Sequence, residues 1–461
     1  MSSRPLKFLL IKPATPEWRL SDEAAGAGRT QMFRYSMLSS LYVAAAMPPF
    51  VETRILDEEV EPIDYDLDAD LVGLSFMTCS APRAYEIASR FRKEKHKPVI
   101  AGGYHPTFLP EEVLQHVDAV CIGEAETAAP RIIEDFLAGS LRPIYRAEPA
   151  SLIRLPVPDR SLIRNGAYAL VDTVQATRGC PHCCSFCSIS AFYQHGFRVR
   201  PIGDVVEELK TLGTRLLFMD DNLIGDVEYA KELFRRMIPL RKRWISQASV
   251  QIVADDELLS LAARSGCRGL FIGFESLSDD NLRRWRKNFN RSQDYRRVVE
   301  KLHRHGIGVC AGMVFGYDWD SVGVFPFTLD FLESARVDAV QATILTPFPG
   351  TELFQEMSRS GRLVEKAWDK YDFSHVVFEP QQMSRQTLQD GHDWLLSRFY
   401  SRTAIARRLF RELGYLCPST ILAATAPLNL SYRRRLRGVG TLRNFIGSFA
   451  RAVPSPGGGA A

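Results

Sequence analysis

The stretch ATRGCPHCCSFCSI, residues 176–189, places four cysteines within eight residues. Three of them, Cys180, Cys184 and Cys187, follow the spacing C-x3-C-x2-C. Three thiolates on one short loop can hold three irons of a 4Fe–4S cube, which leaves the fourth iron open to a non-protein ligand. We therefore expect these three residues to bind such a cluster, with Cys183 outside the ligand set.

A structural zinc site is the alternative interpretation of the same loop, because the four cysteines also form two C-x2-C pairs. Zinc-binding pairs are normally separated by a dozen or more residues. Here the two pairs adjoin, and one short loop closes a tetrahedron poorly. The spacing therefore favours the iron–sulfur cluster, and we expect His182 to be a loop residue rather than a ligand.

Around the cysteine loop, residues 171–360 alternate six apolar strand patterns with helical patterns. Six such units predict a partial α/β barrel, whose catalytic groups belong at the carboxyl ends of the strands. The cysteine loop follows the first strand. Strands are expected at 174–177, 215–219, 245–251, 269–274, 309–315 and 339–345, and helices at 205–212, 227–237, 257–265, 295–305 and 327–334.

The first 140 residues show a second alternating series, which predicts a parallel sheet with helices on both faces. The expected fold is a Rossmann-like, doubly wound domain. Residues 141–170 are proline-rich and predict a linker, and residues 361–461 predict a helical region with a basic tail. Front-domain strands are expected at 7–11, 52–56, 71–76, 98–101 and 119–122, and helices at 37–47, 81–94, 111–116 and 131–137.

The amino-acid composition is that of an ordinary globular protein, with 46% apolar and 24% charged residues and a formal net charge of +4. This balance gives no reason to expect a nucleic-acid partner. No uncharged apolar stretch reaches the roughly 18 residues that cross a membrane, and no signal-peptide core is visible. We therefore expect a cytoplasmic protein. Its nine cysteines do not predict a disulfide framework.

The cysteine spacing, with Phe186 just before the last cysteine, resembles the signature of the radical S-adenosylmethionine (SAM) superfamily. The resemblance implies that SAM chelates the open iron and that an electron from the reduced cluster cleaves it. The 5′-deoxyadenosyl radical that results would abstract a hydrogen from the substrate. Phe186 is expected to belong to this SAM site.

Three later strand ends resemble the SAM-contacting segments of that superfamily, namely LLFMDDN (216–222), FIGFES (271–276) and VCAGMVFGYD (309–318). The residues that the resemblance implies as SAM contacts are Asp220, Asn222, Glu275, Gly312 and Gly316. Helix capping is the alternative role for Asn222 and for Glu275. Turn formation is the alternative for the two glycines.

The strand ends of the front domain resemble the cobalamin-binding domain that precedes many radical SAM enzymes. The chain lacks the D-x-H-x-x-G motif, so no histidine is expected to bind cobalt from below. A Rossmann-like domain that only packs against the barrel is the alternative. The implied cobalamin contacts are Ser75, Met77, Thr78, Gly102, Gly103, His105, Thr107, Gly123 and Glu124.

The segment 373–401 resembles a region of cobalamin-type radical SAM proteins that act on lipids such as hopanoids or on tetrapyrroles. The tail interleaves six arginines with apolar residues, from Arg433 to Arg451. Such a stretch could lie on an anionic membrane, and a solvated helix face is the alternative. These features leave open a small-molecule or lipid substrate and peripheral membrane contact.

The expected function is methyl transfer from cobalamin to an unactivated carbon of a small-molecule, lipid or tetrapyrrole-like substrate. The resemblance also implies a flavodoxin- or ferredoxin-type electron donor. Two alternatives remain: radical cyclisation, rearrangement or carbon–carbon bond formation without methyl transfer, and a non-catalytic iron–sulfur redox or sensor protein. The products of SAM turnover distinguish the three.

Overall fold

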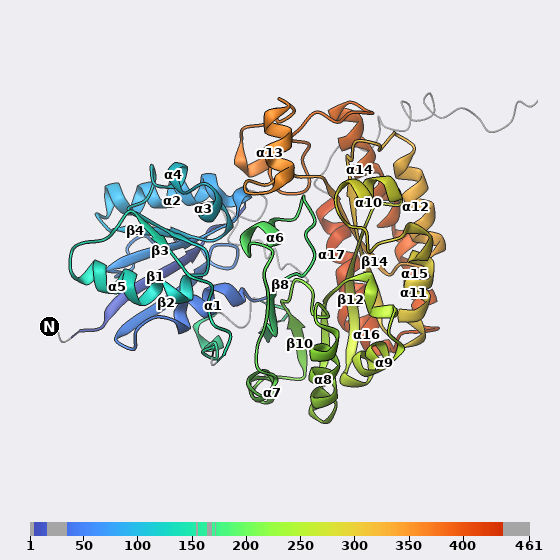
Figure 1. The fold of residues 1–461 in the computed structure, drawn as a ribbon, viewed down its shortest axis with the longest axis horizontal. Helices are drawn as coiled ribbons and strands as arrows, with labels where there is room; N and C mark the ends of the chain where they lie inside the picture. Colours follow the sequence, from blue (N-terminus) through green and yellow to red (C-terminus); the bar gives the residue numbers. More distant parts are fainter. Residues whose placement is uncertain (1–3, 16–34, 154, 164–167, 171, 437–461) are drawn as a thin grey trace, which may run out of the picture.

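Two six-stranded parallel sheets lie side by side in the computed structural model of this chain (Figure 1). The front sheet has the strand order β2-β1-β3-β4-β5-β6, and the second has the order β14-β13-β12-β11-β10-β7. These orders confirm the predicted doubly wound domain followed by an open partial barrel. The structure describes residues 4–15, 35–153, 155–163, 168–170 and 172–436.

The front sheet carries a buried apolar cluster on each face, as expected for a parallel sheet covered by helices on both sides. Its strands are β1 (Leu6–Lys12), β2 (Val51–Asp57), β3 (Leu71–Ser75), β4 (Val99–Gly102), β5 (Ala119–Ile122) and β6 (Ile144–Arg146). Its helices are α1 (Leu38–Ala45), α2 (Ala81–Glu94), α3 (Tyr104–Phe108), α4 (Pro110–Val113) and α5 (Ala129–Leu137).

Strand β6 lies in the segment that the sequence predicts to be a linker. It pairs in parallel with β5, from Val120 opposite Ile144 to Ile122 opposite Arg146. The strand is three residues long and follows Pro143, so it carries too little periodicity to be recognised. The fully buried ring of Tyr145 anchors it to the front domain, so the front sheet extends beyond residue 140.

The second sheet confirms the six predicted barrel strands, with one apolar core beneath them. The strands are β7 (Thr173–Val174), β10 (Arg215–Phe218), β11 (Arg243–Ala248), β12 (Cys267–Glu275), β13 (Gly308–Phe315) and β14 (Ala339–Ile344). The helices are α6 (Ser188–Phe192), α7 (Ile202–Thr211), α8 (Val227–Met237), α9 (Asp256–Ser265), α10 (Asp279–Arg284), α11 (Tyr295–Arg304), α12 (Val324–Ser334) and α13 (Glu352–Arg359).

A small antiparallel hairpin, absent from the sequence prediction, flanks the cysteine loop. It consists of β8 (Thr177–Gly179) and β9 (Phe197–Val199). Gly179 has a φ of 83°, and a Cβ there would lie 2.0 Å from the carbonyl oxygen of Gly196. Only glycine can therefore carry the chain out of β8 into the cysteine loop.

The C-terminal region packs on the barrel as helices, as predicted. The helices are α14 (Arg385–Phe399), α15 (Arg402–Glu412), α16 (Pro418–Thr420) and α17 (Ala426–Leu436). Tyr400 fixes them to β14, since its hydroxyl donates to the Val340 carbonyl at 2.6 Å. The predicted basic tail beyond residue 436 lies outside the described residues. Among the residues described, no helix is long and apolar enough to cross a membrane.

Candidate functional site

A buried carboxylate holds the strand that leads into the cysteine loop. Asp220, at the end of β10, is fully buried. It accepts hydrogen bonds from the Thr177 hydroxyl at 2.7 Å and from the backbone N–H groups of Ala176 and Thr177. Burial raises the pKa of Asp220 to about 6. The carboxylate of Asp220 therefore positions the base of the loop, and its contact with SAM stays a prediction.

The three predicted cluster cysteines line the inside of the loop, and Cys183 faces outward. Cys184 is buried, Cys180 and Cys187 are half-buried, and Cys183 is exposed. Burial raises the pKa of Cys180, Cys184 and Cys187, in Cys184 to about 12. Such thiols become thiolates only when a metal takes the place of the proton.

The donor set of the loop is the one that an iron–sulfur cluster needs. Cys180, Cys184 and Cys187 stand on one short loop, and each thiolate of a cube binds a different iron. His182 bonds to Gln251 at 3.1 Å and stacks on Phe289 at 3.7 Å between ring centroids. The donor set therefore fits a three-cysteine cluster without His182.

Asn222, two residues after Asp220, lies close to the first cysteine of the loop. Asn222 Oδ1 accepts from Ser249 N at 3.3 Å, and its Nδ2 lies 4.0 Å from Cys180 Sγ. Helix α8 is capped by Asp226, which accepts from Tyr229 N, so the capping alternative for Asn222 is wrong. Asn222 therefore lies beside the first cysteine of the loop, and its contact with SAM stays a prediction.

Asp221 is a site residue that the sequence prediction missed. Its Oδ2 accepts from Gly179 N at 3.2 Å, one residue before Cys180. Burial and the neighbouring Asp220 carboxylate raise the pKa of Asp221 to about 7. Both residues lie beyond the end of β10, so only their hydrogen-bond partners distinguish Asp221, at Gly179, from Asp220, at Ala176 and Thr177.

Glu275 carries an ion pair at the carboxyl end of β12. Its φ of 66° is unusual for a residue other than glycine. Its Oε1 accepts from Lys287 Nζ at 2.5 Å, and both side chains are largely buried. The Lys287 segment borders the cysteine loop, since Ser185 N donates to the Trp285 carbonyl. Lys287 is thus a second missed residue, and the SAM contact of Glu275 stays a prediction.

Packing accounts for the remaining residues predicted to contact SAM. A Cβ on Gly312 would lie 2.6 Å from the Phe271 ring, and a Cβ on Gly316 would lie 2.8 Å from Leu388. Phe186 lies at the site's wall, with its ring 6.5 Å from that of Tyr317. Glycine at both positions lets the neighbouring side chains pack closely. The contact of these glycines with SAM stays a prediction.

The carboxyl ends of β3, β4 and β5 form a rim bordered by glycines. The register places Ser75 beside Gly102, and the Thr107 hydroxyl accepts from Gly123 N at 3.0 Å. Of the two residues that follow Phe76, Met77 is 53% exposed and Thr78 is buried. Because glycines stand at two adjacent strand ends, a large ligand can approach the backbone there, so the residues of this rim are suited to hold a corrin.

Two residues that are predicted to contact cobalamin form hydrogen bonds or ion pairs with other protein side chains. His105 is fully buried, with Nε2 3.0 Å from the Tyr85 hydroxyl and its ring against Trp368. Glu124 is buried and paired with Arg178 and Arg198 of the barrel hairpin. Both side chains are therefore bonded within the protein, and the cobalamin contacts of His105 and Glu124 stay predictions. Their partners come from distant segments, which the sequence pattern does not reveal.

Aromatic side chains join the rim to the cysteine loop. Tyr104 follows the two glycines of the rim, and its ring lies 4.6 Å from that of Phe192 in α6. Helix α6 begins directly after Cys187. Gly350, after β14, packs against Phe108 of α3. Segments of both sheets therefore meet at their carboxyl ends, beside α6 and α13 in Figure 1.

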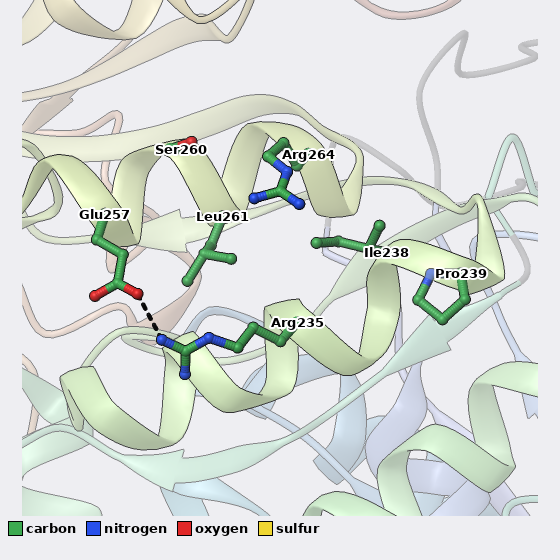
Figure 2. Close-up of a pocket in the computed structure, with 7 residues that line it drawn as sticks. All are labelled: Arg235, Ile238, Pro239, Glu257, Ser260, Leu261 and Arg264. Carbon is green, nitrogen blue, oxygen red and sulfur yellow. Dashed lines mark hydrogen bonds and ion pairs between the residues drawn. The ribbon is translucent and has the colours of Figure 1, made fainter.

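A separate surface pocket of about 440 Å³ lies on the outer helices of the barrel (Figure 2). Helices α8 and α9 line it, and an Arg235–Glu257 ion pair of 2.6 Å crosses it. None of its lining residues belongs to the site described above. They are Arg235, Ile238, Pro239, Glu257, Ser260, Leu261 and Arg264.

The fold and site together define a cobalamin-type radical SAM enzyme: a glycine-bordered Rossmann rim facing a partial barrel that carries a three-cysteine loop. Family models agree, with the radical SAM superfamily matching residues 174–321 and the B12 binding domain matching residues 36–133. The chain belongs to the radical SAM superfamily, in the branch with an N-terminal B12-binding domain. The cofactors of this branch are a 4Fe–4S cluster, SAM and cobalamin.

Curated relatives and solved structures agree with this assignment. Bacteriochlorophyllide d C-12(1)-methyltransferase of Chlorobaculum tepidum is 34% identical over 87% of this chain and 89% of its own. Hopanoid C-2 methylase of Rhodopseudomonas palustris is 25% identical over 88% and 79%. The structure of the methyltransferase TsrM from Kitasatospora setae, with cobalamin and a 4Fe–4S cluster bound, has a TM-score of 0.67 at 15% identity, covering 94% and 99%.

Proposed function

We propose that this chain methylates an unactivated carbon of a tetrapyrrole. The observation that carries the substrate class is the 34% identity to a bacteriochlorophyllide methyltransferase over 87% of the chain. The hopanoid methylase covers a similar share of the chain at only 25% identity. A tetrapyrrole is therefore favoured over a polycyclic lipid.

In this proposal each domain holds one of the two protein-bound cofactors. Cys180, Cys184 and Cys187 would hold the cluster, and the glycine rim around Gly103 would hold cobalamin. When bound, these cofactors supply a radical that removes a substrate hydrogen and a methyl group that replaces it. Both would lie at the junction of the two domains, where the half-buried rings of Tyr104 and Phe192, 4.6 Å apart, would limit the access of water.

We further propose that Asp221 accepts a hydrogen bond from the amino group of SAM. With a single protein hydrogen bond, to Gly179 N, its carboxylate keeps acceptor capacity beside the loop. Replacing Asp221 by asparagine is expected to weaken SAM binding about tenfold or more while preserving the cluster, because a charge-assisted hydrogen bond contributes roughly 1.5–3 kcal/mol. Equilibrium dialysis of SAM against the reconstituted protein measures this.

The matched control for that prediction is Asp226→Asn at the N-cap of α8, where asparagine caps equally well. This control is expected to bind SAM like the wild type. Equal SAM affinity in Asp221→Asn and Asp226→Asn would contradict the assignment of Asp221.

The proposed function is tested with anaerobic protein reconstituted with iron, sulfide and hydroxocobalamin. SAM, a chemical reductant and either a chlorin-type tetrapyrrole or a hopanoid are added, and products are identified by mass spectrometry. We expect a product 14 Da heavier from the tetrapyrrole, with S-adenosylhomocysteine and 5′-deoxyadenosine both formed. Deoxyadenosine without S-adenosylhomocysteine would overturn methyl transfer, and methylation of the hopanoid alone would overturn the substrate class.

We propose a cytoplasmic enzyme, reduced by a flavodoxin- or ferredoxin-type donor, that touches membranes through its C-terminal end. The exposed Leu430 supports this contact, as do the arginines that follow it in the sequence, interleaved with apolar residues. Anionic liposomes should co-sediment the full chain but not a truncation at Leu428. Equal sedimentation of both would refute the membrane contact.

A further inference from the structure

Two arginines of the cysteine hairpin reach across to the front domain. Arg178 lies in β8, two residues before Cys180. Its Nη1 donates to Glu124 Oε2 at 2.8 Å, and its Nη2 donates to Glu126 Oε1 at 2.5 Å. Both glutamates closely follow β5 of the front sheet. These bonds therefore join segments 52 or more residues apart in the chain.

The second arginine, Arg198, lies in β9 and also bonds to Glu124. Arg198 Nη2 donates to Glu124 Oε1, and its Nη1 donates to the Ala150 carbonyl at 2.6 Å. The backbone N–H of Ala150 in turn donates to Glu124 Oε2 at 3.0 Å. Both carboxylate oxygens of Glu124 are thus occupied, and both strands of the hairpin are held.

This network is buried, unlike the many exposed ion pairs of the protein. The side chains of Arg178, Glu124 and Glu126 are 5%, 8% and 13% exposed. The Arg178 guanidinium also lies 5.2 Å from the centroid of the Tyr42 ring. Charge-assisted bonds of a planar guanidinium in a buried setting fix direction as well as distance. The network is therefore a rigid connection rather than a loose attraction.

The ends of the connection lie at the two cofactor sites. Glu124 directly follows Gly123 of the glycine rim, and only Gly179 separates Arg178 from Cys180. We propose that Arg178, Glu124 and Glu126 form a positioning clamp, which sets the distance and orientation of the cobalamin rim relative to the cluster loop. This inference rests on the function proposed above and adds the residues that align its two cofactors.

The clamp matters because two reactive groups must reach one substrate carbon. Reacting atoms need to approach within about 3–3.5 Å, and a misplacement of about 1 Å can slow a reaction a hundredfold. Removing a hydrogen requires only the cluster side, whereas methyl transfer requires both. A loosened clamp should therefore lower methylation more than it lowers SAM cleavage.

The test uses anaerobic holoenzyme carrying Glu126→Gln or Arg178→Lys. The magnetic dipolar interaction between cob(II)alamin and the reduced cluster reports the distribution of distances between them. We expect a broader distribution in both variants, and a several-fold rise in deoxyadenosine formed per S-adenosylhomocysteine, at wild-type iron and corrin content. The matched control is Arg83→Gln, which breaks a buried ion pair with Glu58 inside the front domain.

An unchanged distance distribution and product ratio in Glu126→Gln would overturn the clamp. Glu126→Gln decides the question even if Arg178→Lys loses a cofactor, because it removes the charge of the Arg178–Glu126 pair while keeping the size of the side chain. The same changes in Arg83→Gln would also overturn it, since they would reflect general loss of stability. Wild-type protein that cannot hold both cofactors would instead overturn the proposed function.

Discussion

Replacing Cys184 by alanine is expected to abolish the cluster. The Cys184 thiol is the buried one of the three, and without it the cube keeps only two of its three protein ligands. Iron content should fall from about four per chain to near zero. SAM cleavage should fall to background, because no electron source remains. Iron analysis and the visible absorbance of the anaerobically reconstituted protein measure the loss.

Cys183 provides a control one residue away. It is exposed, and it lies outside the proposed ligand set. Cys183→Ala should keep the iron, the absorbance and the SAM cleavage of the wild type. Iron loss in Cys183→Ala with retention in Cys184→Ala would show that the ligand set is wrong.

Replacing Gly103 by alanine is expected to remove cobalamin and spare the cluster. The residue has φ 110° and ψ −167°, a region that only glycine populates readily. A Cβ there would lie 2.6 Å from the Phe76 carbonyl oxygen, in the loop that carries Met77. Alanine at this position must therefore displace both the Gly103 backbone after β4 and the Phe76 backbone after β3.

The strain of about 1–3 kcal/mol is enough to weaken corrin binding about tenfold to a hundredfold if the rim must restore its shape to bind. Equilibrium dialysis with hydroxocobalamin measures the affinity, and iron analysis checks that the cluster is intact. Gly139→Ala is the matched control, because its φ is 66° and a Cβ there meets no atom within 4 Å. Wild-type corrin affinity in folded Gly103→Ala would contradict the assignment of the rim.

Strand and helix alternation was enough to predict both sheets, because each element carries its own periodicity. Three strands of three residues each were not predicted. Strand β6 and the β8–β9 hairpin have no period to recognise, and they form only because partners lie beside them. The hairpin nevertheless carries Arg178, so an element too short to predict holds the connection between the two cofactor sites.

The sequence by itself determined the cysteine loop, the order of the two domains and the glycines of the rim. These features depend on neighbours in the chain: ligand spacing, strand periodicity and backbone freedom. Only the tertiary structure decided that Asp221 rather than Asp220 faces the loop, and that His105 and Glu124 have protein partners. Those roles depend on which way a side chain points and on what a distant segment places beside it, and neither property is local to the sequence.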